Sequence, residues 1–489
     1  MDQTTDVPTT ATDEKAGSET GVPIPGRFSL FSKLILCLVL VLAADVIFYD
    51  APLGWMSGVV LLTLGGMIMV VHGGEHDDLL RWSAMAWLVG MSLSLVVSIT
   101  PLSLILGMGS LLSVYSLRRF SRTDHAFSFL GSMSWDAIQI PVSPGMDSYA
   151  IIKVASRNKT KDRGGVAQLM QWFVEWLIPA GLFVTFVVLF SLANPIFSSV
   201  FSPLRILFWI MIGGLVWGLL RRPRSAPPST ESMLAVRMPR MSLNAVTRSL
   251  LVFNLLFLIQ NGLDVMYLWG GQTLPEGMTY AEYAHRGAYP LVATALLAAV
   301  FVLISFRGGE KRNRMNWARW LVYAWIIQNI FLLGSAAWRL WIYVDFYGLT
   351  RWRVATGLWM VLVALGLGYI LIRIVGGYSN RWLINVNAAT AIVLLSACTF
   401  VNMDRFIADY NVAHCKEVRG TGVPIDVSYL GELGVDALPA VNQLHQEIED
   451  ARKKQRLEDL QKKFTGQLIH TLDDWRGFTF QRSRLLEDH

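Results

Sequence analysis

Residues 34–44 read Leu-Ile-Leu-Cys-Leu-Val-Leu-Val-Leu-Ala-Ala, an uninterrupted apolar run near the start of the chain. With its flanks the run covers 29–49, and a helix needs about 17–25 residues to cross the hydrocarbon layer of a bilayer. Lipid offers no hydrogen bonds to the backbone, so a helix, whose backbone groups bond one another, is the expected form. The stretch therefore predicts a transmembrane helix.

Similar runs recur along the chain near 54–72, 82–99, 101–117, 172–193, 203–220, 249–269, 288–306, 318–344, 354–375 and 383–402. The chain has 489 residues, of which 53% are hydrophobic and only 16% are charged, whereas soluble domains average about 25% charged residues. About eleven spans of this length predict an all-α fold. We expect a polytopic transmembrane helical bundle with a small helical C-terminal extramembrane tail.

The basic residues set the expected orientation. Dense blocks of Lys and Arg lie in alternate connections between the apolar runs, at 118–122, 157–163, 221–224 and 307–314. The positive-inside rule places such connections in the cytoplasm. We therefore expect a multi-pass protein of a bacterial plasma (inner) membrane, with a cytoplasmic N-terminus and an extracytoplasmic C-terminus. These blocks form no continuous stripe, so the net charge of +6 reflects short basic connections between the spans and does not indicate an anionic partner. We expect the chain to contact membrane lipid and no nucleic acid.

The polar segments divide the chain further. Transmembrane helices are expected in three groups, at 29–117, 172–220 and 249–402. Residues 1–28 predict a disordered cytoplasmic N-terminus, 118–171 an interfacial or loosely folded cytoplasmic insert, and 221–248 a basic, Pro-rich cytoplasmic linker. The tail, 403–489, changes to dense alternating charge, and its stretch 439–465 predicts a solvated helix. The tail is the candidate surface for a protein partner.

One short motif resembles a metal site. His72, Glu75 and His76 match the H-x-x-E-H spacing, in which two His side chains on one helix face bind zinc. Two consecutive glycines between them oppose the helix that this spacing needs, and no third ligand follows at a telling distance. We interpret the stretch as a polar turn, keep the metal site as the weaker alternative, and expect no cofactor.

Polar side chains inside two of the apolar runs form the first candidate functional site. An ionised group at the bilayer centre costs at least about 2.5–3.5 kcal/mol to insert. The cluster comprises Gln260, Asn261, Asp264, Gln328, Asn329 and Arg339. Asp264 and Arg339 lie at similar distances from the outer ends of their spans, which predicts that they share a depth and either form an ion pair or line one cavity. The other interpretation is structural, because hydrogen bonds between helices, worth about 0.6 kcal/mol each, also hold bundles together.

The outer connection at 274–287 is the second candidate site. Thr279 and Glu282 have the spacing of a capping box, which predicts a short helix along the membrane surface. Its candidate residues are Tyr280, Glu282, Tyr283 and Arg286. Two interpretations stay open, one in which these side chains only anchor the loop at the interface and one in which they act in function.

This connection also carries a family resemblance. It reads Leu-Pro-x-Gly-Met-Thr-Tyr-Ala-Glu-Tyr-Ala-x-Arg-Gly, which resembles the hallmark of the bacterial membrane family known as domain of unknown function 4173, related to 4153. The likeness continues through 347–350, 402–411, 426–430 and 433–439. The chain departs from the pattern at His285 and at 288–290. The resemblance implies a membrane protein with 249–402 as its family-like core, and it implies no reaction.

No nucleotide-binding, kinase, hydrolase or protease motif occurs in the sequence, so we expect no enzyme. The leading hypothesis is an envelope-associated scaffold or sensor with the tail as its binding appendage. The alternative is a transporter or a lipid-acting membrane enzyme that uses the polar cluster of the seventh and ninth spans. A cavity open to water or lipid would distinguish the two, if it lies around Gln260, Asp264, Gln328 and Arg339.

Overall fold

The computed structural model describes residues 30–71, 78–117, 126–158, 202–221, 243–270 and 316–487, with short helical pieces between 179 and 190. Seven of the described helices are long and apolar enough to cross a membrane: α1 (Leu30–Phe48), α3 (Asp78–Val97), α8 (Pro203–Leu220), α10 (Leu243–Asp264) with the π-helical turn η2 (Val265–Trp269), α12 (Asn316–Tyr347), α13 (Arg351–Gly376) and α14 (Asn380–Cys398). Two shorter apolar helices, α2 (Met56–Val71) and α4 (Pro101–Ser116), accompany them.

The surface of these helices is apolar on the outside. At most 33% of the residues in each candidate span are buried inside the protein, so most of their hydrophobic side chains face outward, as lipid-facing helices require. The all-α, polytopic fold is confirmed for the described part of the chain. The fifth and eighth predicted spans, 172–193 and 288–306, lie largely or wholly outside the described residues.

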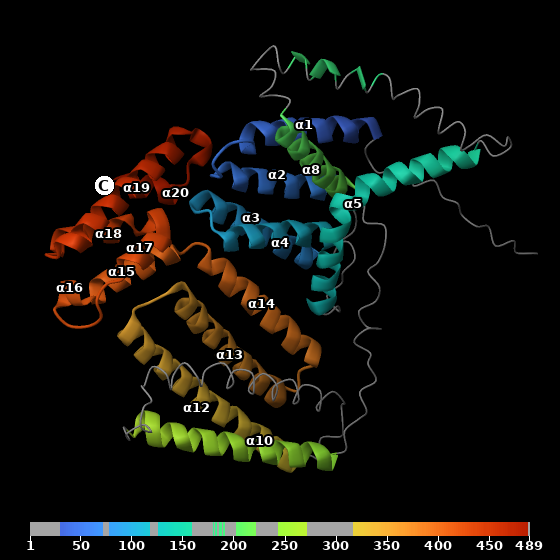
Figure 1. Ribbon diagram of the computed structural model, residues 1–489. Coiled ribbons are helices and arrows are strands. Elements are labelled where there is room, and N and C mark those ends of the chain that lie inside the picture. Colours follow the sequence, from blue (N-terminus) through green and yellow to red (C-terminus); the bar gives the residue numbers. More distant parts are fainter. Residues whose placement is uncertain are drawn as a thin grey trace, which may run out of the picture.

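The bundle has two halves (Figure 1). Helices α1 to α4 pack with α8 and with α5 (Ala126–Asn158), whereas α10, α12, α13 and α14 pack side by side in chain order. Helix α14 joins the halves. Trp87 Nε1 of α3 donates to Ser396 Oγ at 3.1 Å, and the Ser98 hydroxyl donates to the carbonyl of Thr399 at 3.2 Å.

Helix α5 differs most from the sequence-based expectation. It is one continuous helix with Pro141 and Pro144 inside it, and it bends (Figure 1), because each proline removes a backbone hydrogen bond and its ring clashes with the preceding turn. Gly218 of α8 packs on the carbonyl of Ile140, where an added Cβ would lie 2.2 Å from the oxygen. The expectation of a loosely folded insert over 118–171 is thus wrong for its described part. Its place relative to the membrane stays a prediction.

The tail folds into a domain of its own. Its helices are α15 (Met403–His414), α16 (Lys416–Arg419), α17 (Val427–Leu433), α18 (Leu438–Glu447), α19 (Ala451–Asp473) and α20 (Phe480–Glu487), with the 3-10 turns η3 (Gly434–Ala437) and η4 (Trp475–Gly477). Ile407, Leu430, Leu444 and Phe464 are among the side chains of its buried hydrophobic core. We call residues 403–487 the tail domain.

The sequence predicts a single solvated helix over 439–465, and this prediction is wrong. It is divided into α18 and α19 at Ile448, which has extended backbone angles and is buried in the core. Asp450 then caps α19 by accepting hydrogen bonds from the backbone N–H groups of Arg452 and Lys453. A cap of this kind favours a new helix start over continuation of the preceding helix. As a result α19 is not fully solvated: the apolar face of the helix packs into the buried core of the tail domain.

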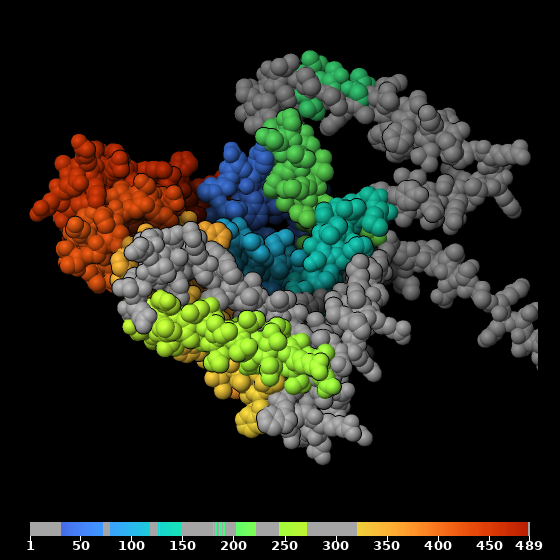
Figure 2. Space-filling model, turned by 60° about the horizontal axis from the view of Figure 1, so that its bottom comes forward, coloured from blue at the N-terminus to red at the C-terminus, as the bar shows by residue number. Residues whose placement is uncertain are grey.

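The tail domain lies at one end of the bundle, from which it stands out as a separate body (Figures 1 and 2). Three turns of the bundle meet it there: 49–55 between α1 and α2, 98–100 between α3 and α4, and 348–350 between α12 and α13. Within each of the three helix pairs that these turns join, the two helices therefore run in opposite directions, as the sequence-based topology expects. Which side of the membrane this end faces stays a prediction.

Candidate functional site

The polar cluster of α10 and α12 contains a buried ion pair. Asp264 ends α10 and is followed directly by η2, and Arg339 lies one helix away on α12. The Arg339 guanidinium donates to Asp264 Oδ1, and the two side chains are 5% and 0% exposed. The pairing that the sequence predicts is confirmed. The π-helical turn beside it is a feature often found at functional sites.

Amide side chains extend this cluster along the two helices. Gln260 Nε2 donates to Asp264 Oδ1 at 3.0 Å, Gln328 Nε2 to Asn254 Oδ1 at 3.2 Å, and Asn261 Nδ2 to the Gln328 carbonyl at 3.1 Å. Asn329 is buried but donates to the carbonyl of Trp325 on its own helix. The predicted residues thus lie together at the contact between α10 and α12. Asn329 is the exception in one respect, since its recorded hydrogen bond stays within α12.

Two amide oxygens of the cluster stand out. Among the described residues, Asn261 Oδ1 and Gln328 Oε1 are buried and have no hydrogen-bond partner. A buried carbonyl oxygen without a donor is costly, about 1–3 kcal/mol. Whether the cluster serves function or only holds α10 to α12 stays a prediction.

The other candidate residues of the sequence lie elsewhere. His72, Glu75 and His76 fall in 72–77, outside the described residues, so the polar-turn interpretation stays a prediction. The outer-connection residues, Tyr280, Glu282, Tyr283 and Arg286, also lie outside them. Within the described ranges no group of three or more His, Cys, Asp or Glu side chains could hold a metal ion.

A second ion pair, which is partly buried, joins α1 to α8 and was not predicted. Arg205 donates through Nε to Asp45 Oδ1 at 2.8 Å, and its Nη2 pairs with Asp45 Oδ2. Trp209 Nε1 donates to the same carboxylate at 2.8 Å. The guanidinium also lies over the ring of Tyr49, 5.0 Å from its centroid. A charge inside an apolar run signals such a pair, but its partner is far away in sequence.

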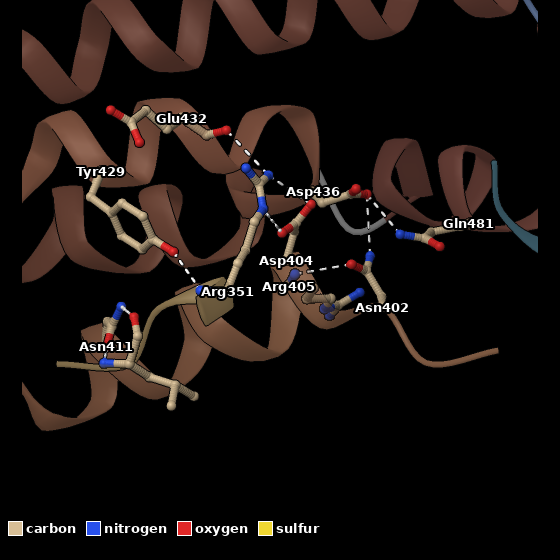
Figure 3. A network of polar contacts seen from close by, with 10 residues as sticks. Arg351, Asn402, Asp404, Arg405, Asn411, Tyr429, Glu432, Asp436 and Gln481 are labelled. Atoms are coloured by element: carbon tan, nitrogen blue, oxygen red, sulfur yellow. Dashed lines mark hydrogen bonds and ion pairs between the residues drawn. The ribbon is translucent and has the colours of Figure 1, made fainter. Parts of the chain in front are cut away.

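A polar network fixes the tail domain to the start of α13 (Figure 3). Arg351 donates to both carboxylate oxygens of Asp404, at 2.6 and 2.9 Å, and to the carbonyl of Glu432 at 3.2 Å. Its own backbone N–H donates to the hydroxyl of Tyr429 at 2.9 Å. The first residue of a membrane-spanning helix therefore binds α15 and α17 of the tail domain at once.

Neighbouring residues complete this network. Asn411 Oδ1 accepts from the backbone N–H of Leu349 at 2.6 Å, and its Nδ2 donates to the Leu349 carbonyl at 2.8 Å. Asn402 and Gln481 donate to Asp436 Oδ1 at 3.2 and 2.7 Å. The family-like stretches of the sequence, separated along the chain, thus meet at this junction (Figure 3).

The turn between α1 and α2 forms a second contact with the tail domain. The backbone N–H of Trp55 donates to the carbonyl of Phe478 at 2.8 Å, and its indole Nε1 donates to that of Trp475 at 3.2 Å. Arg476 Nη1 donates to the carbonyl of Val46 at 3.0 Å. Backbone atoms on both sides take part in these bonds.

A cavity of about 710 Å³ opens between the bundle and the tail domain. Its floor includes the α3–α4 turn, 98–100, and its walls come from η3, α19 and α20. The charged side chains at its lining are Asp436, Lys462, Lys463 and Arg482. Burial lowers the pKa of the Arg482 guanidinium, which Asp436 partly offsets.

Asp436 makes the stability of this junction depend on pH. Burial raises the pKa of its carboxyl above the ordinary value, although the hydrogen bonds from Gln481 and Asn402 lower it and the charge of Asp404 raises it further. The carboxyl of Asp436 has a higher pKa in the folded protein than in the unfolded chain. Its contribution to the free energy of unfolding therefore decreases as the pH rises from the unfolded pKa to the folded pKa, and it does not change further at higher pH.

We therefore expect Asp436→Asn to unfold at a higher temperature than the wild type at neutral pH, where the wild-type side chain is a half-buried carboxylate. Well below the ordinary carboxyl pKa of about 3.9, both proteins carry a neutral side chain and the difference should vanish. Circular dichroism during heating, at both pH values, measures it. An equal difference in unfolding temperature at both pH values would show that burial of the charged carboxylate is not the cause.

These features define an all-α chain that has several membrane-crossing helices and carries a helical domain on the turns at one end. Residues 34–444 match the family described as Domain of unknown function (DUF4153), and the chain belongs to that family. No curated protein and no solved structure matches the chain. The match ends within α18, so α19 and α20 lie beyond it.

Sequence reasoning missed the residues of the junction. Arg351, Asp404 and Asp436 look like ordinary charged residues at span ends and in a polar tail. The signal that could have found them was the family resemblance, because 347–350, 402–411 and 433–439 border or contain them. For Lys462 and Lys463 the sequence offers no such signal.

Proposed function

We propose that this chain is a multi-pass protein of a bacterial plasma membrane, in which the bundle holds the tail domain at the outer surface as an envelope scaffold or sensor. The docking of the tail domain supports this most directly. The domain has its own core, and ordered hydrogen bonds from Leu349, Arg351 and Trp55 tie it to two turns of the bundle. A domain held in this way presents a fixed surface to a partner outside the membrane. We further infer that the C-terminal half follows the 4173-type pattern.

Accessibility to a membrane-impermeant maleimide tests the orientation. Single cysteines would be placed at Glu449, in the exposed turn between α18 and α19, and at Tyr378, in the exposed turn between α13 and α14 at the other end. The native cysteines Cys37, Cys398 and Cys415 would first be replaced. We expect Glu449→Cys to be labelled in intact cells and Tyr378→Cys only after permeabilisation. The reverse pattern would overturn the proposal.

The alternative, a transporter or lipid-acting membrane enzyme, is favoured by one observation. Asn261 Oδ1 and Gln328 Oε1 are buried acceptors without a donor among the described residues, and polar groups of this kind within membrane spans often mark a pathway. Flux of an ion or a lipid in proteoliposomes that is lost on Asn261→Ala would support this alternative over the scaffold.

A further inference from the structure

The cavity at the junction has a chemical character that the scaffold role does not use. It begins where the apolar window of α3 ends, at Val97, because 98–100 form part of its lining. In a membrane-spanning helix this is the level of the lipid headgroups. The cavity therefore lies between the headgroup region and the tail domain.

Its cationic groups are available to a ligand. Lys462 and Lys463 lie exposed on α19, and no ion pair or hydrogen bond of either ammonium group occurs among the described residues. Glu458, one turn earlier, contacts His445 at 3.4 Å instead. By contrast Lys453, on the same helix, pairs with Glu417. Two adjacent ammonium groups at the rim thus form no ion pair with any carboxylate of the described residues.

The third cation and the neutral groups complete the lining. Arg482 Nη1 donates to the carbonyls of Leu53 and Gly477, at 2.8 and 2.7 Å, and the nearby charge of Asp436 also acts on its guanidinium. Thr100 and Thr479 add hydroxyl groups to the lining, whereas the hydroxyls of Ser98 and Thr471 already donate to backbone carbonyls. The other hydrogen-bonding side chains of the lining are Gln467, His470 and Gln481. Ammonium, guanidinium and hydroxyl donors together suit the oxygens of a phosphate group.

We propose that this cavity binds a phosphate-bearing group, with Lys462 and Lys463 as its main cationic contacts. Asp436 is the one carboxylate of the lining, and its Oδ1 already accepts hydrogen bonds from Asn402 and Gln481. The proposal deepens the scaffold or sensor role by giving the junction a ligand class. It rests on that role only for the side of the membrane that the cavity faces.

Binding to the purified full-length chain in detergent tests the proposal, with inorganic phosphate and glycerol phosphate as soluble probes. Nanodiscs of phosphatidylglycerol, with phosphatidylcholine nanodiscs as reference, are the lipid probe. We expect Lys462→Gln/Lys463→Gln to weaken binding of at least one phosphate probe about tenfold or more. If the double variant binds the soluble probes more weakly, the ligand of the cavity is a free phosphate ester. If it binds only the phosphatidylglycerol nanodiscs more weakly, the ligand is a lipid headgroup. Unchanged binding of every probe, or no binding, overturns the proposal.

A matched control separates a site from general surface charge. Lys454→Gln/Arg456→Gln removes two positive charges from the same helix outside the cavity lining. We expect this control to bind like the wild type, and equal loss in both double variants overturns the proposal. Both pairs are at least partly exposed, so unfolding temperatures should match. Binding is measured on purified protein, so its failure is distinct from a failed orientation test.

A third variant gives a result of opposite sign. Asp436→Asn removes a negative charge from the lining while keeping an oxygen that Asn402 and Gln481 can bond. We expect it to bind the phosphate probe more tightly than the wild type. Weaker binding would show that the carboxylate holds a cationic part of the ligand, which overturns a site for the phosphate group alone.

Discussion

Replacing Arg339 with glutamine should lower the free energy of unfolding of the bundle by about 3–5 kcal/mol. The substitution removes the guanidinium that faces Asp264, whose side chain is 0% exposed. A carboxylate in a medium that solvates it poorly then loses its counter-charge, and its neutralisation costs free energy as well. Unfolding in mixed micelles, followed by circular dichroism, measures the change.

Two controls make this prediction specific. Asp264→Asn/Arg339→Gln leaves no lone charge and should lose less than the sum of the single losses, with a coupling of about 0.5–3 kcal/mol. Arg351→Gln removes one partner of a pair whose side chains are 50% and 27% exposed. It should lose only about 0.2–1 kcal/mol, because water screens that pair. Strictly additive losses at Asp264 and Arg339 would show that the two sites act independently.

The spans and this ion pair could be predicted because lipid imposes a simple rule on sequence. Each span must satisfy its own backbone and avoid lone charges, so apolar length locates helices and a charge within them calls for a partner. Asp264 and Arg339 share a depth, which sequence position reports directly. Asp45 and Arg205 obey the same rule. Their partnership depended on which distant helices pack together, and the apolar pattern does not contain that information.

The tail domain could be predicted only as helical. Dense charge over 439–465 hides the residues that matter, because the buried Leu457 and Phe464 are spaced among Lys, Arg and Glu. The break at Ile448 comes from an N-cap at Asp450, a local signal that competes with a strong propensity for one long helix. Helix α5 was missed for a related reason. Its two prolines indicate a break in helix, whereas packing against α4 and α8 retains the helix with a bend.

The junction depends on three-dimensional contact, and Gly54 shows how closely the two parts meet. A Cβ atom at Gly54 would lie 2.0 Å from the carbonyl oxygen of Arg476 and 2.6 Å from that of Phe478. Both obstacles are backbone atoms, which cannot move aside by changing rotamer. The Phe478 oxygen also accepts the hydrogen bond from the Trp55 backbone. Relief of the clash therefore requires the η4–α20 segment to leave the α1–α2 turn.

We expect Gly54→Val to undock this segment of the tail domain while the core of the domain stays folded. Overpacking costs typically about 1–3 kcal/mol, and a contact with backbone belongs at or above the top of that range. Limited proteolysis with trypsin, which cleaves after Lys and Arg, measures the undocking. In the docked state Arg476 and Arg482 donate hydrogen bonds to the carbonyls of Val46 and Leu53, which restrict the access of trypsin to them. Cleavage after these two arginines should become at least tenfold faster, as about 1.4 kcal/mol of weakened docking already implies.

The matched control is Gly466→Ala, in α19, where an added Cβ meets nothing within 4 Å. Alanine in a helix interior is favoured over glycine by about 0.5–1 kcal/mol, so this variant should be cleaved no faster than the wild type. Helical circular dichroism of Gly54→Val should stay near the wild-type value, because the buried core around Leu444 and Phe464 does not include the clash. Wild-type cleavage rates in Gly54→Val would show that the turn and the tail domain separate freely, and that the bundle does not hold the domain in place.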